Sequence, residues 1–344
     1  MELSERKKDV LSAISRAYIS TGEPVGSKTL TELMHNAPSS ATLRNEMSEL
    51  SEMGLLSQPH TSAGRIPTDR GLKLYVEELM RSSELSVSVR ERIDRELRNI
   101  TAAPELIPQK AGELVYRLTG LPVFTCFYTE KVPQVLRAEI MPIGKNAATL
   151  LLLSGDGRAR HRIVRLHTPL TADGLQRFRT VVRERIRGRP VSELDRAALQ
   201  TVIASSGMEL LAEAPLLAAV FELAGEIETS GAELHGVSAL YSVCGSETAA
   251  RRITELVRLH EPIISLVHKA PGASGVIFGS ETGFPEFSGM SIVLAKYSGS
   301  DRYQGAIGVI GPHRMPYDRV IAGLEYVASR MTESITEAQK DMEE

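Results

Sequence analysis

Helix-breaking residues cut the first part of the chain into short segments, and each segment carries apolar side chains at helical spacing. Ser4 is the expected N-cap of the first helix, which ends at Thr21-Gly22 because Glu23-Pro24 prevents it from continuing. The apolar stripe of this helix consists of Val10, Ile14 and Ala17, widened by Leu11 and Tyr18. Segments this short cannot form one long helix, so we expect a small helical unit over residues 1–80.

The second and third segments are separated by a four-residue turn. Ser27 is expected to cap a short helix over Lys28–Met34, which buries Leu30 and Leu33. The proline at the end of His35–Pro38 biases the residue before it away from helical geometry, so these four residues form the turn. Two helices joined this tightly are typical of a helix-turn-helix, and a plain three-helix bundle is the alternative.

The third segment has one apolar face and one small polar face. Ser39 or Ser40 is expected to cap a helix over Ala41–Met53, which Gly54 ends. The buried side consists of Leu43, Met47 and Leu50. The start and the exposed side of this helix carry Ser39, Ser40, Thr42, Arg44 and Asn45. Arginine can bind guanine, asparagine can bind adenine, and a hydroxyl can bind a base or a phosphate, so this face is a candidate DNA-binding surface.

A polar ribbon with a proline near each end follows the helices. Leu55-Leu56 predicts a short strand, and residues 58–68 are rich in turn-forming residues and contain no carboxylate. Because proline limits strand pairing, this segment is expected to protrude as a hairpin. A protruding ribbon after a helix-turn-helix is typical of a wing, and a solvated surface loop is the alternative. The further candidate DNA-binding residues are Ser27 and Lys28 on the second helix, and His60, Thr61, Ser62, Gly64 and Arg65 on the ribbon, where arginine suits a phosphate or a minor groove.

Charge limits what a single copy could do on DNA. The chain has 40 Lys and Arg against 43 Asp and Glu, and residues 1–75 contain nine of each kind. Affinity for DNA rests largely on neutralising phosphates, so one copy would bind weakly. We therefore expect a homodimer that binds two half-sites of double-stranded DNA.

Distinctive strings lie near both ends of the chain. They are Thr21–Leu30, Ser39–Met47 followed by Gly54–Leu56, Pro59–Thr68, and Gly308–Ile321. Together these strings resemble the heat-inducible transcription repressor family (HrcA), and Pro59–Thr68 is the most specific of them. The similarity between the two ends is weaker.

The resemblance implies a winged-helix repressor that binds an inverted-repeat operator upstream of chaperone genes and leaves it on heat shock. It also implies that a chaperonin keeps the repressor active. Two routes of release stay open: the dimer or its domain packing loosens with temperature, or the folded state needs chaperonin help. A different class of function is a ligand-gated DNA-binding regulator whose GAF-like domain binds a small molecule.

The rest of the chain predicts a connector and a mixed domain of helices and strands. Strands are expected at residues 122–129, 135–141, 275–279, 291–296 and 303–310, with a hairpin of 149–153 and 160–166 across Asp156-Gly157, and a closing helix at 317–335. By similarity to the family, we expect an α+β multidomain chain with an N-terminal winged helix-turn-helix and a C-terminal GAF-like α/β sheet domain that carries an inserted, mainly helical dimerising domain. The expected ranges are 1–80 for the winged helix, 81–103 for a linker helix, 104–189 and 263–344 for the GAF-like domain, and 190–262 for the insertion.

Two polar segments have an ordinary interpretation and a functional one. Gly279–Gly283 is expected to be a loop between strands, with an anion-binding loop as the alternative. Six arginines fall between Arg177 and Arg189, with Glu184 as the one carboxylate among them. A solvated or salt-bridged helix face is the ordinary interpretation of these arginines, and an auxiliary phosphate contact is the alternative.

No pattern for catalysis, metal binding or cofactor binding stands out. Cys126 and Cys244 have no metal-ligand spacing, the eight histidines form no zinc motif, and nucleophile-elbow and phosphate-loop motifs are absent. We therefore expect no enzyme, no metal and no cofactor. The apolar runs are shorter than the roughly 18 residues that span a bilayer, and the N-terminus does not resemble a signal peptide, so a soluble cytoplasmic protein is expected.

Overall fold

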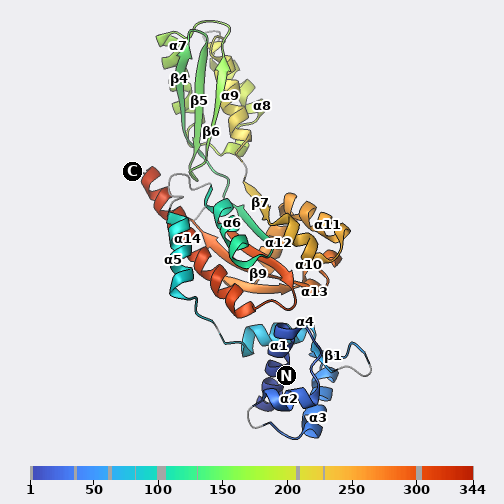
Figure 1. The fold of residues 1–344 in the computed structure, drawn as a ribbon. Coiled ribbons are helices and arrows are strands. Elements are labelled where there is room, and N and C mark those ends of the chain that lie inside the picture. The colour runs from blue at the N-terminus through green and yellow to red at the C-terminus, as the bar shows by residue number, and fades with distance from the viewer. Residues whose placement is uncertain are drawn as a thin grey trace.

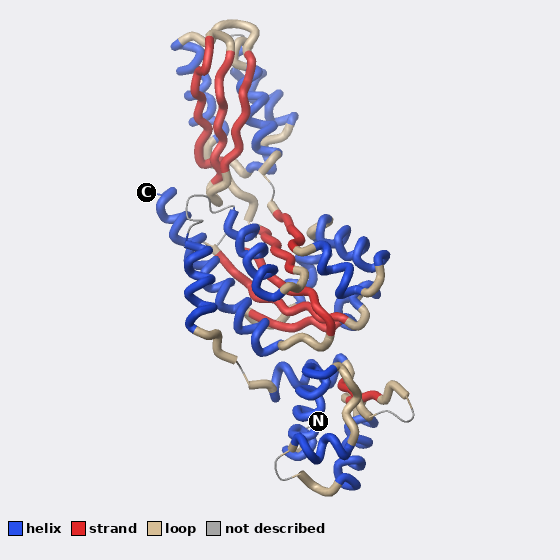
Figure 2. The backbone as a smooth tube through the Cα atoms, in the orientation of Figure 1, coloured by secondary structure: helices blue, strands red, loops and turns tan. Residues whose placement is uncertain are grey.

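The computed structural model describes residues 3–34, 37–60, 64–81, 83–98, 106–129, 131–206, 210–227, 229–299 and 304–343. These residues form three units that follow one another along a long axis (Figure 1). An N-terminal unit of helices lies at one end, a five-stranded sheet covered by helices forms the central unit, and a three-stranded sheet with its own helices forms the outer unit at the other end (Figure 2).

The N-terminal unit, residues 3–79, combines three helices, a two-stranded ribbon and a closing helix. Its elements are α1 (Glu5–Thr21), α2 (Ser27–Leu33), α3 (Ser40–Glu52), β1 (Leu56–Ser57), β2 (Ile66–Pro67), α4 (Asp69–Leu74) and a π-helical turn (Tyr75–Leu79). The core contains Ile14, Leu30, Leu43 and Leu50, all fully buried. The two strands pair antiparallel, so the predicted hairpin is confirmed.

Local capping chemistry sets the ends of these helices. Ser4 caps α1 through its hydroxyl, and Gly22 ends it in the left-handed conformation with φ 75°. Ser39, of the two predicted candidates, caps α3 by accepting a hydrogen bond from the Thr42 N–H at 3.2 Å. The expected cap at Ser27 is wrong by one position, because Gly26 precedes α2 and Ser27 is its first residue. The predicted turn residues His35 and Asn36 lie outside the described residues.

The predicted linker range holds a helix that packs on the central unit. This helix, α5 (Val87–Arg98), buries Ile93 and Leu97 against the core, and its Asp94 carboxylate accepts a hydrogen bond from the Tyr326 hydroxyl at 2.9 Å. Because α5 is held in this way, and because Met80 and Leu85 also pack against the central core, the connection between the N-terminal unit and α5 is short.

The central unit is an antiparallel sheet with helices on both faces. Its strands are β3 (Val123–Tyr128), β7 (Ser230–His235), β8 (Ser274–Phe278), β9 (Met290–Ser298) and β10 (Gln304–Pro312), in the order β7-β3-β10-β9-β8. The helices are α5, α6 (Ile107–Thr119) and α14 (Tyr317–Glu343) on one face, and α10 (Val237–Cys244), α11 (Glu247–Arg258) and α12 (Glu261–Lys269) on the other. Alternation along β9 sends Val293 to the first core and Leu294 to the second, which explains the uninterrupted apolar run of this strand.

The outer unit, residues 135–227, has a separate core. Its strands β4 (Val135–Gly144), β5 (Ala147–Ser154) and β6 (Ala159–Arg165) form an antiparallel sheet in that order. Helices α7 (Ala172–Val181), α8 (Arg196–Ser206) and α9 (Ala214–Gly225) pack on one face of it. Leu150, Phe178 and Val220 are fully buried between the sheet and the helices.

This arrangement corrects the expected position and content of the insertion. The predicted hairpin around Asp156-Gly157 forms, but its strands pair with β4 and with each other, outside the five-stranded sheet. In contrast, β7, α10 and α11 fall within the range 190–262 and pack with the central unit. The inserted unit therefore runs from β4 to α9 and contains a sheet, so it is not mainly helical. Period-2 alternation predicts strands, and it carries no information about which sheet a strand joins.

The described residues contain neither a membrane-spanning helix nor a metal-binding cluster. No helix in the described ranges combines the length and apolarity needed to cross a bilayer. In those ranges no group of three or more His, Cys, Asp and Glu side chains could hold a metal ion.

Candidate nucleic-acid interface

The starts of α2 and α3 meet at one corner of the N-terminal unit. The hydroxyl oxygens of Ser27 and Ser40 lie 2.9 Å apart, so a side-chain hydrogen bond joins the two helices. Next to it, the Ser39 hydroxyl contacts the Thr42 hydroxyl at 3.0 Å while it caps α3. The N-terminal end of α3 thus combines the positive end of the helix dipole with several hydroxyls, an arrangement that favours anions such as phosphate.

The solvent-facing side of α3 carries the side chains that suit base edges. Arg44 and Asn45 are exposed, as is Lys28 at the start of α2. In the part of the chain that the structure describes, the Arg44 and Lys28 side chains make no ion pair. These cations are therefore available to an incoming ligand.

Two of the three carboxylates of α3, Glu46 and Glu49, pair with α1. Lys7 on α1 lies 3.1 Å from the Glu46 carboxylate and 2.8 Å from the Glu49 carboxylate, and Arg6 lies 4.0 Å from Glu46. Hydrogen bonds to Glu49 and Glu46 raise the pKa of Lys7 above its ordinary value of 10.5. Because α1 takes up these two carboxylates, the first half of α3 presents a positive and hydroxyl-rich surface.

A close backbone approach fixes the ribbon to the helices. Val25 and Arg65 exchange two backbone hydrogen bonds of 2.9 Å each, and a Cβ atom on Gly64 would overlap the Val25 carbonyl. Gly64 is thus required for packing, a role that the sequence analysis did not foresee. Arg65 is half-buried, and its Nε has no hydrogen-bond partner within the described residues.

The predicted site residues fall into two groups. Those on the helices lie together at the start of α2 and along the first turns of α3: Ser27, Lys28, Ser39, Ser40, Thr42, Arg44 and Asn45. On the ribbon, His60 is exposed, while Thr61 and Ser62 lie outside the described residues. Sequence reasoning missed Val25, whose bridge to Arg65 joins the ribbon to the helices; a β-branched residue between Pro24 and Gly26 was the available signal.

The arginine-rich segment lies far from this surface. Arg177 pairs with Glu213 at 2.8 Å, Arg183 with Glu184 at 3.5 Å, and Arg189 with Glu193 at 3.5 Å. The segment belongs to α7 and the turn after it, in the outer unit, at the opposite end of the molecule from α3 (Figure 1). Its geometry matches the salt-bridged interpretation.

The comparisons with known proteins concern almost the whole chain. Residues 105–321 match the family model described as the HrcA protein C terminal domain. A relative from Desulfitobacterium hafniense is 31% identical over 98% of this chain and 99% of its own length, and one from Acetivibrio thermocellus is 30% identical over 97% of each chain. Both are named heat-inducible transcription repressor HrcA.

A solved structure shares the fold. A crystal structure described as that of a hypothetical protein is 26% identical, covers 98% of this chain and all of its own, and superimposes with a TM-score of 0.69.

A helical unit with a polar α3 face, joined to a larger α/β core, is typical of the class of DNA-binding transcription regulators. Within that class, this chain belongs to the HrcA family of heat-inducible transcription repressors. It is a repressor that acts in the heat-shock response, and DNA binding follows from that role. The family names do not favour the ligand-gated alternative.

Proposed function

We propose that the repressor binds an inverted-repeat operator of double-stranded DNA as a homodimer, with the N-terminal unit acting as a winged helix-turn-helix. In this proposal the first half of α3 enters the major groove and the β1–β2 ribbon lies beside it as the wing. The observation that carries the proposal is the α3 surface itself, where Arg44 and Asn45 are exposed while Glu46 and Glu49 are paired with α1.

Each predicted residue other than Gly64, which is required for packing, then has a role. Arg44 and Asn45 contact base edges, and Thr42 and Ser40 contact a base or a phosphate. Ser39 keeps the start of α3 in place, and Ser27 and Lys28 hold the phosphate backbone near the start of α2. The wing residues His60, Thr61, Ser62 and Arg65 support binding from the side.

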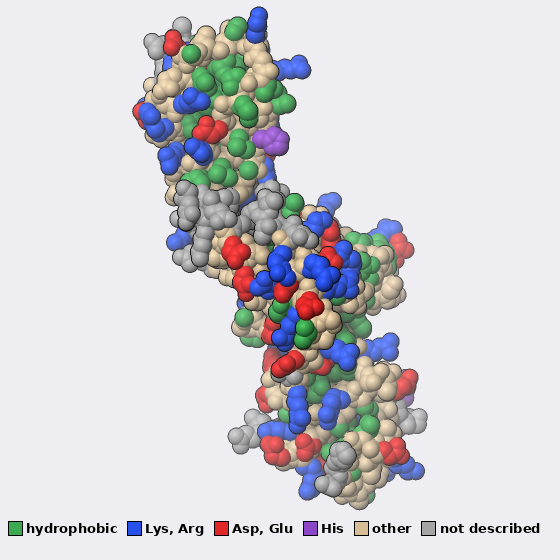
Figure 3. Space-filling model, turned by 60° about the vertical axis from the view of Figure 1, so that its left-hand side comes forward, with side chains coloured by type: hydrophobic (Ala, Val, Ile, Leu, Met, Phe, Trp, Pro, Cys, Tyr) green, Lys and Arg blue, Asp and Glu red, His purple; other side chains and the backbone are tan. Residues whose placement is uncertain are grey.

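The outer unit supports the homodimer. Helices cover one face of its sheet, and the other face leaves large aliphatic side chains in solvent: Met141 is 63% exposed, Ile163 62%, Ile143 54% and Leu151 41%. Hydrophobic side chains gather on this unit in the space-filling view (Figure 3). An apolar sheet face of this kind is typical of a protein interface, and a second copy of the same face is its simplest partner.

Exposed charged and polar side chains on the same strands fit a two-fold arrangement. Arg137, Glu139 and His161 are exposed on β4 and β6, and Glu139 and His161 both lie opposite Leu151 in the strand register. Charges of both signs around one apolar surface allow a face to pair with its own copy.

The proposed operators control chaperone genes, and a chaperonin is the proposed modulator. Heat shock lowers operator occupancy either because the dimer or its domain packing loosens, or because free chaperonin becomes scarce. Operator affinity measured across temperature, with and without chaperonin, separates these routes. Since it acts on chromosomal DNA, the proposed location is the cytoplasm.

The test is a binding titration on two duplexes of equal length. One duplex carries the inverted repeat found upstream of chaperone genes and the other carries the same bases in scrambled order. We expect tighter binding to the inverted repeat and an affinity that falls steeply with salt. Equal binding to both duplexes, unchanged when chaperonin and ATP are added, would contradict the proposal.

A further inference from the structure

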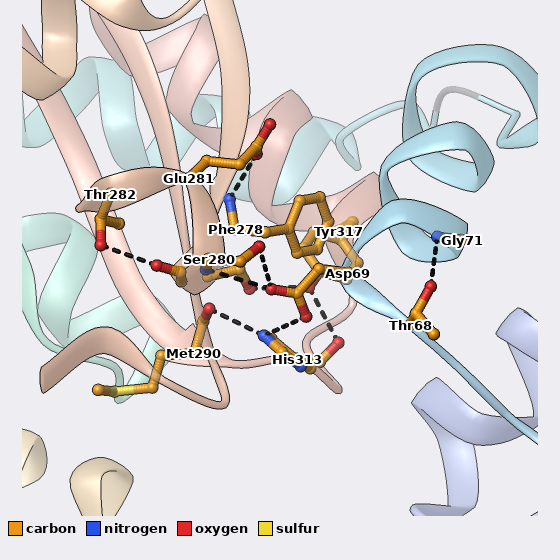
Figure 4. A network of polar contacts seen from close by, with 12 residues as sticks. Thr68, Asp69, Gly71, Phe278, Ser280, Glu281, Thr282, Met290, His313 and Tyr317 are labelled. Atoms are coloured by element: carbon orange, nitrogen blue, oxygen red, sulfur yellow. Dashed lines mark hydrogen bonds and ion pairs between the residues drawn. The ribbon is translucent and has the colours of Figure 1, made fainter. Parts of the chain in front are cut away.

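A polar cluster joins the N-terminal unit to the central unit (Figure 4). Asp69, the first residue of α4, accepts hydrogen bonds through Oδ2 from the Ser280 backbone N–H at 3.2 Å and from the Ser280 hydroxyl at 2.6 Å. Its other oxygen, Oδ1, lies 3.3 Å from Nε2 of His313. Gly279–Gly283, expected to be a loop, forms the short helix α13 (Gly279–Thr282) and its C-cap glycine. The anion that it holds is a carboxylate from 211 residues earlier in the chain.

Contacts within the central unit hold both partners of Asp69 in place. The His313 Nε2 also lies 2.9 Å from the Met290 carbonyl oxygen, and its own carbonyl accepts a hydrogen bond from the buried Tyr317 hydroxyl. The Glu281 carboxylate accepts a hydrogen bond from the Phe278 N–H at 3.0 Å, which fixes the turn around Ser280. The carboxylate-binding group on the central unit is thus organised by its own contacts.

Further contacts lie in the same region between the N-terminal unit and the central unit, which we call the joint. Leu72 of α4 is fully buried among core residues of the central unit, and Lys73 forms an ion pair with Glu281. The Arg314 guanidinium lies against Gly22 at the end of α1. Arg314, together with His313 and Tyr317, comes from the string Gly308–Ile321, for which the sequence analysis found no role.

Hydrogen bonds and close backbone packing hold α4 against the segment that follows α3. Thr68 donates a hydrogen bond to the Gly54 carbonyl at 2.7 Å, and Arg70 donates one to the Met53 carbonyl at 3.3 Å. The backbone of Gly71 passes so close to the Leu55 carbonyl that a Cβ atom would overlap it. Because these contacts hold α4 against the end of α3, the two helices move together. Binding of Asp69 to the central unit therefore also fixes the direction of α3.

We propose that Asp69, Ser280 and His313 are positioning residues for operator recognition. They fix the direction of α3 relative to the central unit and, through the dimer, the separation between the two α3 helices. That separation determines the half-site spacing that the repressor accepts. The inference rests on the proposed function, because it needs two chains on one inverted repeat.

The physical reason is effective concentration. When both α3 helices are held at the spacing of the operator, binding of one half-site places the second helix on the other half-site. When the joint opens, each N-terminal unit stays linked to its central unit by the chain before α5 alone. The effective concentration of the second α3 at its half-site then falls, and the preference for one half-site spacing falls with it.

The test compares variants of the full chain on a set of duplexes. Asp69→Ala removes the carboxylate from the joint, Ser280→Ala removes one of the two Ser280 donors to it, and Asp69→Asn keeps an oxygen that can accept from Ser280. Glu78→Ala is the matched control, because Glu78 is exposed in the turn that follows α4 and carries the same charge. The duplexes carry the native inverted repeat, the same repeat with about five extra base pairs between half-sites, or one half-site.

We expect wild type and Glu78→Ala to prefer the native spacing by roughly tenfold or more. Asp69→Ala should lose most of this preference and Ser280→Ala part of it, each with unchanged affinity for one half-site. The double variant should be no worse than Asp69→Ala, and Asp69→Asn should restore part of the preference. An unchanged spacing preference in Asp69→Ala, a parallel loss on the half-site, or tighter binding to the native operator would each overturn the proposal.

A DNA-free measurement separates this inference from the proposed function. Hydrogen exchange of the α4 amides should accelerate in Asp69→Ala and stay unchanged in Glu78→Ala. If wild type shows no preference for the inverted repeat, the proposed function fails whatever the exchange result. If wild type prefers the repeat and α4 exchange does not change in Asp69→Ala, only the joint is refuted.

Discussion

The N-terminal unit and the outer unit lie at opposite ends of the molecule and present different surfaces to solvent (Figure 1). In the N-terminal unit, α3 buries Leu43 and Leu50 and exposes Arg44 and Asn45. In the outer unit, helices cover one side of the sheet, and the other side exposes aliphatic residues such as Ile163. A polar surface with free cations suits a charged polymer, whereas an apolar sheet face suits another protein.

The two units are also attached to the central unit in different ways. The N-terminal unit is held by hydrogen bonds and ion pairs around Asp69, with Leu72 as a buried apolar contact. At the outer unit, Arg158 lies over the Phe127 ring at 4.5 Å and pairs with the buried Asp156 at 3.3 Å. The comparison leads to four predictions, given in order of decreasing effect.

The largest effect on stability is expected from a cavity in the core of the outer unit. Phe178→Ala removes a fully buried ring and should lower the free energy of unfolding of the outer unit by about 3–5 kcal/mol. Hydrogen exchange should accelerate in β4–β6 and stay unchanged in α1–α3. Leu211→Ala truncates an exposed leucine of the same unit outside the sheet face, so it is the control and should change little. Faster exchange at both ends would show that the units do not fold separately.

A charge on the apolar sheet face should disrupt the dimer. Ile163→Asp places a carboxylate among exposed aliphatic side chains and should weaken self-association by about 2–4 kcal/mol, or about 30- to 700-fold in Kd. Sedimentation velocity over a concentration series measures the change. Gln200→Asp, on the exposed side of α8, adds the same charge and should leave the dimer intact. Equal behaviour of the two variants would place the interface elsewhere.

Truncation of the exposed arginine of α3 should reduce operator binding. Arg44→Ala should weaken binding to the inverted repeat by about 1–3 kcal/mol, or about 5- to 150-fold, if its guanidinium binds a base edge. Arg6→Ala removes the same charge from α1 and should have a smaller effect. Equal losses on operator and scrambled duplex would show that Arg44 contacts phosphate only.

The smallest effect concerns pH and the central sheet. Burial lowers the pKa of His235 below its ordinary value of 6.5, against the opposite influence of Glu233 and Glu113. The unfolded chain therefore binds this proton more readily than the folded chain, so stability is complete above pH 6.5 and decreases as the pH falls below it. Chemical unfolding of wild type should show this decrease, and His235→Gln should show a shallower one. Identical slopes would exclude His235 as the cause.

Local chemistry in the sequence predicted part of this fold, namely the elements whose signals lie within a few residues of one another. The capping of α1 by Ser4 and Gly22 depends on residues within one turn, and so does the capping of α3 by Ser39. Strands β8, β9 and β10 were predicted for a similar reason, because their apolar runs end at turn residues. Patterns of this kind extend over a few neighbouring residues.

Contacts between distant segments could not be predicted in this way. The sequence could not show that β4–β6 leave the five-stranded sheet, because either sheet would accept the same alternation. It identified Gly279–Gly283 as a possible anion-binding loop. It could not identify Asp69 as the anion, because no pattern in either segment indicates contact with the other. Likewise, Gly64 was predicted to bind DNA, and its close approach to Val25 is evident only in the structure.

The most direct test of this account is the stoichiometry of the protein on DNA. Wild type and Ile163→Asp are titrated onto duplexes with one half-site and with two, and the mass of each complex is determined by sedimentation. The account predicts two wild-type chains bound cooperatively to two half-sites, and independent, weaker binding of Ile163→Asp chains with one chain per half-site. A single wild-type chain on the full operator, or undiminished cooperativity in Ile163→Asp, would contradict the claim that one end of the molecule binds DNA and the other pairs the chains.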